Sequence, residues 1–343
     1  MNEIDLRSDT VTLPSPEMRR AITEAELGDD VFAEDPTVNR LQEMAAEAMG
    51  KEAALLTSSG TQSNLIAQLT HCPRGREVIV GDSAHILFFE QGGAWQVGGL
   101  GLRTVRTDSK GRLDLNEVRA FIRPDNEHFP RTGLICVENT HNRAGGTVQN
   151  EEDLAAVRDV ADQHGLPVHM DGARIFNAAV KLGVPAARLA AYADSVCFSL
   201  SKGLGCPVGS MLCGTKEYIA EARRYRKVLG GGMRQAGIIA AAGVYALEHM
   251  VDRLAEDHEN AQRAAKGLAE MPGVRLSPAP ETNLLYFIVD GWDAGRLVHK
   301  LAKAGVLCFD EGGRIRWVTH YGIERADIDE ALERTRSVLA AGA

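Results

Sequence analysis

Asp171 and Lys202 carry the strongest chemical signal in this sequence. Lys202 lies between the apolar segment 195–199 and a loop that contains two glycines. A lysine amine held away from bulk water loses its charge readily, and the free amine attacks a carbonyl carbon to form a Schiff base. Asp171 ends the apolar run 167–171, so a buried strand is expected to deliver its carboxylate at the strand's carboxyl end.

Together the two side chains fit the needs of pyridoxal phosphate. Its aldehyde binds a lysine as a Schiff base, and a carboxylate keeps the proton on its ring nitrogen, which makes the ring an electron sink. Ligands of open α/β sheets bind outside the carboxyl ends of the strands, so Asp171 and Lys202 are expected at one edge. Each is weak evidence alone, because a lysine in such a loop is commonly a surface residue. Their order and spacing favour the cofactor.

Two further segments are expected to bring polar groups to the same edge. Segment 58–64 follows a strand and opens a helix, where Gly60 and Thr61 offer backbone amides to a phosphate group. The alternative is a plain helix cap, since no Walker lysine follows. His85 comes just after the candidate strand 77–81 and could stack on a pyridine ring or transfer protons near neutral pH. The alternative for His85 is a polar loop histidine.

Substrate-binding groups are also predicted. His141, at the end of another candidate strand, could position or deprotonate a substrate hydroxyl. Arg174 and Arg316 could each hold a carboxylate bidentately, as an amino-acid substrate requires, although an arginine at a strand start is common. Arg234 ends a run of three glycines and a methionine, and it could reach a phosphate or make a subunit contact.

The composition excludes several classes of protein. The 343 residues are 44% hydrophobic and 25% charged, which is typical of a globular enzyme, and the net charge of −9 argues against nucleic acid as a partner. No signal peptide or long apolar run is present, so a cytoplasmic protein without a membrane partner is expected. The six cysteines form no Cys-x-x-Cys pair and the histidines lack ligand spacing, which predicts buried thiols and no metal site.

Apolar runs that alternate with amphipathic stretches predict an α/β fold for the larger part of the chain. The candidate strands are 53–57, 77–81, 103–106, 133–138, 167–171, 195–199 and 209–213. Helical patterns occupy 61–71, 114–123, 150–164 and 216–227. Strands that alternate with helices need crossover connections, so we expect a mainly parallel seven-stranded sheet flanked by helices on both faces.

A smaller α+β unit is expected after residue 245. Its predicted elements are a helix at 247–270, a strand at 283–289, a helix at 293–304, a strand at 314–319 and a closing helix at 324–340. The predicted domains are therefore 1–245, an N-terminal arm with the large domain, and 246–343, the small domain.

Several blocks of this sequence resemble one enzyme family. They are residues 5–10, 28–31, 59–61, 138–142, 171–174, 200–205, 230–235 and 316–320. In these blocks and their order the chain resembles the low-specificity L-threonine aldolases, which are fold-type I pyridoxal-phosphate enzymes related to the β-eliminating lyases. The likeness covers essentially the whole chain, and the Asp-Leu-Arg-Ser-Asp-Thr and Gly-Gly-Gly-Met-Arg-Gln blocks are quite specific to the family.

The resemblance implies roles around the cofactor. Lys202 would carry the pyridoxal phosphate, and Asp171 would pair with its ring nitrogen. His85 would stack on the ring, and Gly60 and Thr61 would bind the phosphate.

The resemblance also implies how the substrate is held. Ser8, Arg174 and Arg316 would bind its carboxylate, with Arg174 near the cofactor as well, and His141 would lie near its hydroxyl. Arg234 would approach the phosphate from a neighbouring subunit, because such enzymes are similar to dimers of dimers with shared active sites.

The implied reaction is the retro-aldol cleavage of L-threonine or L-allo-threonine to glycine and acetaldehyde, with other β-hydroxy-α-amino acids as further substrates. His141, His85 or an activated water could take the hydroxyl proton. The fold alone also allows β-elimination, transamination or decarboxylation, and a non-catalytic binding protein is a third hypothesis. Phe32, Cys206 and the segment 143–146 depart from residues common in the family, which affects the expected substrate preference more than the use of the cofactor.

Overall fold

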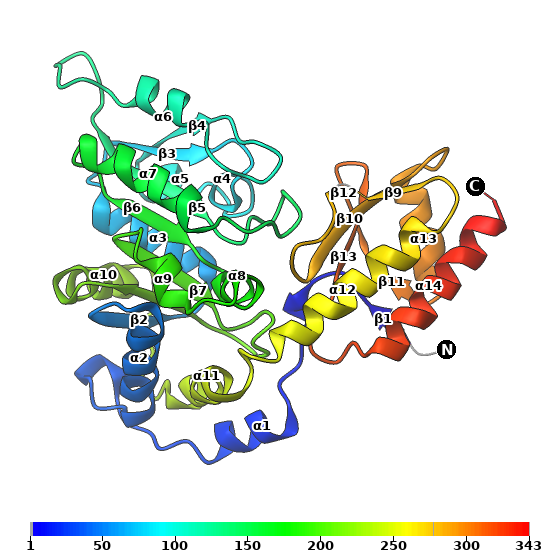
Figure 1. Cartoon of the computed structure of the whole chain (residues 1–343). Helices are drawn as coiled ribbons and strands as arrows, with labels where there is room; N and C mark the ends of the chain where they lie inside the picture. The colour runs from blue at the N-terminus through cyan, green and yellow to red at the C-terminus, as the bar shows by residue number, and fades with distance from the viewer. Residues whose placement is uncertain (1–2, 277, 343) are drawn as a thin grey trace.

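The computed structural model describes residues 3–276 and 278–342, so the outermost ends of the two predicted domains lie outside the described residues. A seven-stranded sheet forms the centre of the larger unit, with helices on both faces (Figure 1). Its strand order is β2-β8-β7-β6-β5-β3-β4. The bounds are β2 (Ala53–Thr57), β3 (Glu77–Gly81), β4 (Gly101–Val105), β5 (Thr132–Glu138), β6 (Val168–Asp171), β7 (Ser195–Ser199) and β8 (Ser210–Gly214).

The predicted seven-stranded sheet is confirmed. Three strands have the predicted bounds, and the other four begin and end within two residues of them. Pairing is parallel from β4 through β3, β5 and β6 to β7, whereas β8 runs antiparallel to both β7 and β2. Every residue of β5, β6, β7 and β8 is buried, as expected for strands covered on both faces.

Local capping explains where the main helices of the large unit begin. Asp35 accepts hydrogen bonds from the backbone of Thr37 and Val38, with Pro36 in the first helical position, and Ser59 accepts one from Gln62. The helices are α1 (Pro16–Thr23), α2 (Pro36–Met49), α3 (Gly60–His71), α4 (His85–Phe88), α5 (Gly93–Gln96), α6 (Leu115–Phe121), α7 (Glu151–Gln163), α8 (Ile175–Leu182), α9 (Ala186–Ala190), α10 (Lys216–Val228) and α11 (Gly237–His249).

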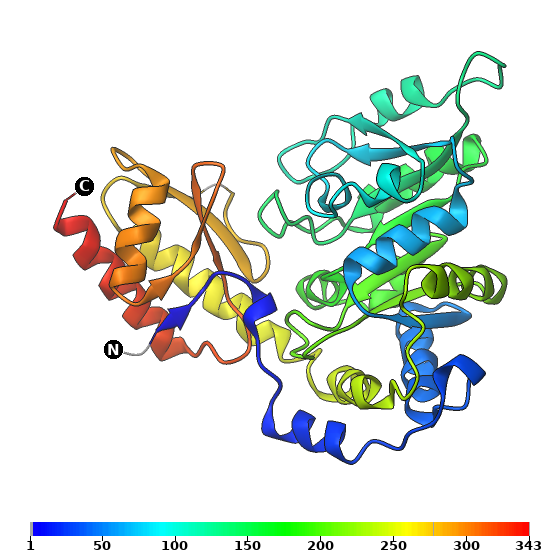
Figure 2. The same ribbon diagram turned by 180° about the vertical axis from the view of Figure 1, so that it is seen from behind.

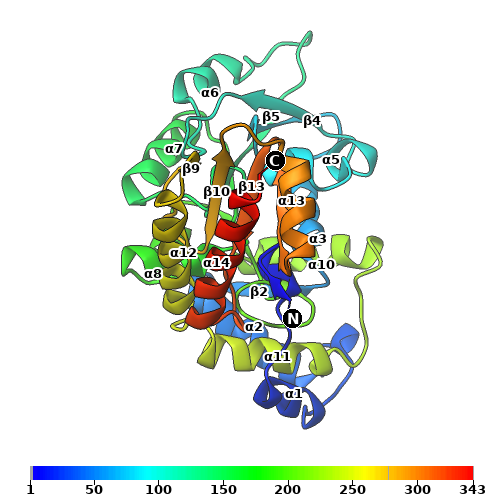
Figure 3. The same cartoon turned by 90° about the vertical axis from the view of Figure 1, so that its right-hand side faces the viewer.

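The smaller unit is an antiparallel sheet with helices packed on one face (Figure 3). Its strands, in spatial order, are β12 (Phe309–Glu311), β13 (Arg314–Val318), β10 (Leu284–Val289) and β9 (Val274–Leu276). Its helices are α12 (Leu254–Ala269), α13 (Ala294–Lys303) and α14 (Arg325–Ala340). Trp317 and Phe287 meet edge to face at 5.5 Å in its core.

The N-terminal arm joins the two units (Figure 2). Its first strand, β1 (Ile4–Asp5), pairs in parallel with β11 (Val306–Leu307) of the small unit, and the backbone of Val318 donates to Leu6. Ile4 and Leu6 are buried in the small unit's core. Residues 4–6 therefore pack with the C-terminal unit, while the division at 245 and 246 stays a prediction.

The single helix predicted at 247–270 is wrong, because two helices meet there. α11 continues to His249 and α12 begins at Leu254. No glycine or proline separates them, so the sequence gives no breaker signal. The two helices differ in environment: α11 packs against α1 and α2, whereas α12 packs against α14 and β9 of the small unit and also contacts α8 of the large unit.

The six cysteines are all buried and unpaired, as predicted. Within the described residues, no helix has the length and apolar character that a membrane span requires.

A buried ion pair fixes the arm to the large unit. Arg226 on α10 places Nη2 at 2.5 Å from Oδ2 of Asp30, and its Nη1 donates to the backbone carbonyl of Leu56 in β2. The side chains of Arg226 and Asp30 are 2% and 1% exposed, so the pair is buried, and Arg223 approaches the other oxygen of Asp30 at 3.3 Å.

Replacing Arg226 with methionine should lower the free energy of unfolding by about 3–5 kcal/mol, because it leaves the Asp30 carboxylate buried without its main partner. The matched control is Arg224→Met, since Arg224 is exposed on the same helix and should change stability by less than about 1 kcal/mol. Urea denaturation followed by circular dichroism measures both. Equal losses of stability in the two variants would contradict a stabilising role for the buried Arg226–Asp30 ion pair.

Candidate active site

A cavity of about 340 Å³ lies at the carboxyl edge of the large sheet, where the arm and the small unit meet it. The arm and both units contribute to its walls. The lining residues are Ser8, Thr10, His85, Phe89, Asn142, Arg174, Lys202, Phe309, Asp310, Glu311 and Arg316. Five of the residues predicted to bind cofactor or substrate therefore line one cavity: Ser8, His85, Arg174, Lys202 and Arg316. A groove of about 740 Å³ elsewhere, beside α12, has no lysine among its lining residues, and two of its arginines, Arg253 and Arg263, are held in ion pairs.

Asp171 is buried at the end of β6 and is held by two donors. The backbone N–H of Ala173 donates to Oδ1 at 3.1 Å, and Nδ2 of Asn64 donates to Oδ2 at 2.9 Å. Burial would raise the pKa of Asp171, but the charges of His85 and Lys202 and the Asn64 hydrogen bond lower this pKa below its ordinary value. The carboxylate is therefore ionised and can hold a proton on a ligand's ring nitrogen.

Lys202 follows β7 at the same edge and is half-buried. Its pKa is lowered, first by burial and then by the positive charge of Arg174, although Asp9 and Asp171 oppose the shift. A lowered pKa raises the fraction of free amine near neutral pH, and the free amine is the form that attacks an aldehyde.

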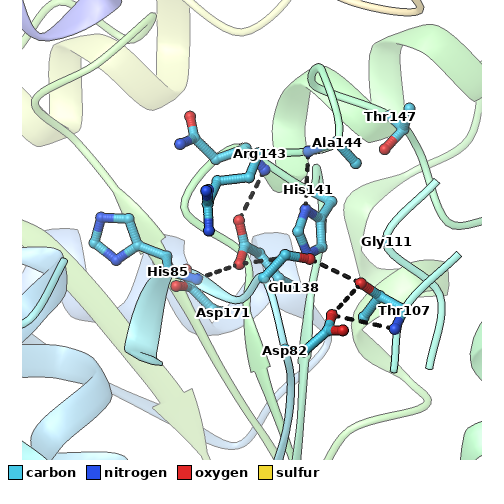
Figure 4. A network of polar contacts seen from close by, with 12 residues as sticks. Asp82, His85, Thr107, Gly111, Glu138, His141, Arg143, Ala144, Thr147 and Asp171 are labelled. Carbon is cyan, nitrogen blue, oxygen red and sulfur yellow. Dashed lines mark hydrogen bonds and ion pairs between the residues drawn. The ribbon is translucent and has the colours of Figure 1, made fainter. Parts of the chain in front are cut away.

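Two glutamates position His85, and Figure 4 shows its contact with one of them, Glu138. Its backbone N–H donates to Oε2 of Glu138 at 2.7 Å, and its ring Nδ1 lies 3.0 Å from Oε1 of Glu90. Burial would lower the pKa of His85, but the hydrogen bond to Glu90 and the charge of Asp171 raise it above its ordinary value. Neither glutamate was assigned a role from the sequence; Glu138 opens a block quoted for the resemblance, whereas no pattern marks Glu90.

His141 lies behind the cavity wall. Its side chain is buried, and its Nδ1 accepts a hydrogen bond from the backbone of Ala144 at 3.2 Å (Figure 4). Its Nε2 is 4.0 Å from Glu138, and Gly111 packs so closely that a Cβ there would lie 2.2 Å from the imidazole ring. In these contacts the His141 ring packs against Gly111 and accepts a hydrogen bond from its own loop. The role of His141 at a substrate hydroxyl stays a prediction.

Arg174 is fixed by a carboxylate that sequence reasoning missed. Its Nε and Nη2 donate to the two oxygens of Asp9 at 2.6 and 2.7 Å, and both side chains are buried. Asp9 lies beside the predicted Ser8 in the arm, but only the fold brings it to Arg174. The pair holds the arm against the end of β6.

Arg316 retains capacity to bind an anion. Its Nη2 donates to Oδ1 of Asn142 at 3.0 Å, and Nη1 of Arg174 approaches the same oxygen at 3.3 Å. The buried Nε of Arg316 has no hydrogen-bond partner and lies 3.7 Å from Glu311. Two guanidinium groups therefore converge on one oxygen at the cavity wall, which is the arrangement that a carboxylate requires.

The remaining predicted residues lie outside this cavity's walls. Gly60 and Thr61 begin α3, where a Cβ on Gly60 would touch nothing, so free backbone amides are accessible there. Arg234 is exposed and lies 3.3 Å from Asp29. Within one chain, Arg234 is not brought to Lys202.

One cluster has the residue types of a metal site. Ligand atoms of His85, Glu90 and Asp171 lie within 4.8 Å of one another. However, Nδ2 of Asn64 donates to both carboxylates, at 2.7 and 2.9 Å, and an amide donor at the same oxygens opposes a cation. The cluster suits a ligand that donates a proton.

Comparisons with known proteins found relatives that match nearly the whole chain. Residues 5–290 match the sequence family described as beta-eliminating lyase. Low-specificity L-threonine aldolase 1 of Arabidopsis thaliana is 44% identical over 340 residues, which cover 97% of this chain and 95% of that protein. The low specificity L-threonine aldolase of Escherichia coli strain K12 is 45% identical over 337 residues, or 98% and 99% of the two chains. A solved threonine aldolase of Leishmania major, 21% identical, shares the fold with a TM-score of 0.84 over 97% of this chain and 99% of that one.

Replacing Asp9 with asparagine should change the acid dependence of stability. The pKa of Asp9 is held well below its ordinary value because the attraction of Arg174 outweighs burial. A lowered carboxyl pKa stabilises the fold at pH values above the unfolded pKa near 3.8, and this contribution is lost as the pH falls further. At about pH 5 the variant should be less stable by about 3–5 kcal/mol.

The difference between variant and wild type should narrow at about pH 3, because Asp9 of the unfolded chain, with a pKa near 3.8, then takes up a proton that the folded protein still excludes, and this favours unfolding of the wild type. The control is Asp329→Asn, whose carboxylate forms an exposed pair with Arg263. Guanidinium denaturation at both pH values measures the two differences. A gap of the same size at both pH values would count against this role of Asp9.

Proposed function

Because this chain belongs to the family of low-specificity L-threonine aldolases, within the beta-eliminating lyases, we propose that it cleaves L-threonine and L-allo-threonine to glycine and acetaldehyde. Pyridoxal phosphate is the proposed cofactor, with Lys202 as its point of attachment. Other β-hydroxy-α-amino acids are proposed as further substrates. One observation carries the proposal: a lysine with a lowered pKa, an ionised buried aspartate and two converging arginines meet at one sheet edge.

The described residues fit the cofactor. Asp171 offers an ionised oxygen where a pyridinium N–H needs an acceptor, His85 lies beside it, and the free amides at the start of α3 suit a phosphate. When bound, pyridoxal phosphate withdraws electrons from the Cα of an attached amino acid, so that a bond to that carbon can break.

We propose that Arg174 and Arg316 determine which bond to Cα breaks, because they orient the substrate. Arg316 has a buried Nε without a hydrogen-bond partner, and Asp9 holds Arg174 rigidly beside it. A substrate carboxylate bound between the two guanidinium groups would have one orientation, and this orientation also fixes the direction of the Cα–Cβ bond. The Oδ1 of Asn142 lies between the two guanidinium groups. On substrate binding, the Asn142 side chain would move aside or rotate so that its amide N–H₂ faces the carboxylate.

His85 is better placed than His141 to act on the substrate's hydroxyl proton, because only His85 lines the cavity. The Nδ1 proton of His85 is directed to Glu90, so when the ring gives up its second proton, Nε2 becomes the acceptor for the hydroxyl proton. An activated water stays the alternative.

Lys202→Ala should abolish acetaldehyde formation from L-threonine and the visible absorbance of the cofactor-loaded protein. The control Lys216→Ala changes an exposed lysine and should retain full activity. A coupled acetaldehyde assay on both L-threonine diastereomers and their D-enantiomers measures the loss and the stereochemical preference. 2-Oxobutyrate with ammonia would instead indicate β-elimination, and a keto acid without ammonia would indicate transamination.

We further propose a cytoplasmic homotetramer whose active sites are shared between subunits. Arg234 is exposed and lies away from its own chain's cavity. Four large apolar side chains are exposed, two close to Arg234 in the sequence and two in the arm: Val228, Ile238, Leu27 and Phe32. A second copy of the chain would cover them. A partner placed on this face would bring its Arg234 to the phosphate of the neighbouring site.

Mixing two inactive variants tests the sharing of sites. Chains with Lys202→Ala and chains with Arg234→Ala, unfolded and refolded together, should recover about a quarter of the wild-type activity, because half of the random dimers are hybrids and each hybrid holds one intact site. Either variant refolded alone provides the control. No recovery in verified hybrids would place Arg234 outside the partner's site.

A further inference from the structure

A chain of hydrogen bonds leads from Asp171 into the interior of the large unit. Nδ2 of Asn64 lies 2.9 Å from Oδ2 of Asp171, and Oδ1 of Asn64 lies 3.0 Å from Nε2 of His169. Ser195 Oγ lies 2.9 Å from Nδ1 of His169 and 2.8 Å from Nε2 of His71. His169 and Ser195 are fully buried and Asn64 is 1% exposed.

The sequence places these groups on matching faces of α3 and the sheet. Asn64 and His71 lie two turns apart on one side of α3, while His169 and Asp171 alternate onto one face of β6. Ser195 begins the neighbouring strand β7. Most other contacts in this interface are apolar, including Ile66, Ala67 and Leu212. Polar groups buried at such a place are costly unless all are satisfied, so their arrangement needs a reason.

The direction of the first hydrogen bonds follows from charge. Asn64 faces two carboxylates, Asp171 at 2.9 Å and Glu90 at 2.7 Å, and an ionised carboxylate oxygen only accepts. The amide N–H₂ of Asn64 must therefore point to them, and its Oδ1 must point to His169. The thiol of Cys197, 3.2 Å from the same Oδ1, agrees with this orientation. Nε2 of His169 consequently carries a hydrogen.

The rest of the chain follows from the neutrality of the two histidines. Burial lowers the pKa of His169 to about 3 and that of His71 to about 4, so both rings are neutral at physiological pH. With its hydrogen on Nε2, His169 accepts at Nδ1 from the hydroxyl of Ser195. The oxygen of Ser195 then accepts from Nε2 of His71. Every donor in this series of hydrogen bonds therefore points toward Asp171.

We propose that His169, as the neutral Nε2–H tautomer, is a positioning residue for the cofactor: it fixes the Asn64 amide so that Asp171 receives a hydrogen bond and stays ionised against the ligand's ring nitrogen. This inference rests on the cofactor site proposed above. Without the His169 donor, the buried Oδ1 of Asn64 would keep only the Cys197 thiol as a partner, so the amide would be held less firmly. Its hydrogen bond to Asp171 would then weaken, which favours protonation of Asp171 and weakens its hold on the ring proton.

The tautomer itself can be measured without turnover. Solid-state ¹⁵N spectra of the full chain labelled at histidine nitrogen, with and without pyridoxal phosphate, should show a neutral His169 protonated at Nε2 at about pH 7 and pH 8. The His169→Gln spectrum, subtracted from the wild type, identifies the signal. A charged ring, or a hydrogen on Nδ1, would overturn the proposal even if the enzyme binds cofactor normally.

A matched pair of variants tests the function of the donor. The amide nitrogen of glutamine reaches the position of Nε2, whereas that of asparagine reaches only the position of Nδ1. His169→Gln should therefore keep kcat within about threefold of wild type, whereas His169→Asn should lose about tenfold or more, with KM unchanged in both. His169→Asn should also bind pyridoxal phosphate at least about tenfold more weakly.

Equal behaviour of two variants with equal thermal stability would overturn the proposal, because a packing role would not distinguish the two amides. Failure of the wild-type protein to bind pyridoxal phosphate would instead refute the proposed function, and the tautomer measurement would still report on the hydrogen-bond chain alone.

Discussion

The negative charge of Asp171 is the constraint around which the site is built. An ion buried at the end of β6 is costly unless the protein supplies donors and positive charge nearby. Asn64 and the backbone of Ala173 supply the donors, and His85 and Lys202 supply the charge. The coupling acts in both directions: Asp171 raises the pKa of His85 and opposes the lowering of the Lys202 pKa that burial and Arg174 cause. One buried carboxylate thus links the state of each titratable group at this edge.

A second buried carboxylate joins the parts of the molecule that form the cavity. Asp9 comes from the arm, Arg174 follows β6, and Arg316 belongs to the small unit's sheet. Because β1 pairs with β11 before the chain reaches Asp9, the arm is anchored to the small unit on one side and to the large unit on the other. The anion-binding wall is therefore assembled from both units, and its geometry depends on their packing.

Much of the large unit could be predicted from the sequence, because buried parallel strands are short apolar runs with polar residues at their ends. Asp171 and Lys202 were predicted for this reason, since Asp171 ends such a run and Lys202 comes three residues after another. Asp9 was not, because only the fold brings it to Arg174, 165 residues away. Glu90 was not, because a glutamate five residues after a histidine matches no recognised pattern. The position of His141 also escaped prediction: a strand end indicates the edge, but not whether a side chain faces the cavity or its own loop.

The most direct test of this account is to locate the covalent attachment of the cofactor. Sodium borohydride reduction of the protein loaded with pyridoxal phosphate, followed by proteolysis and mass spectrometry, makes the attachment permanent and finds the modified peptide. The account predicts one modified residue, Lys202, and no modification when borohydride is omitted. Modification of a different lysine, or none in a protein that binds the cofactor stoichiometrically, would contradict it.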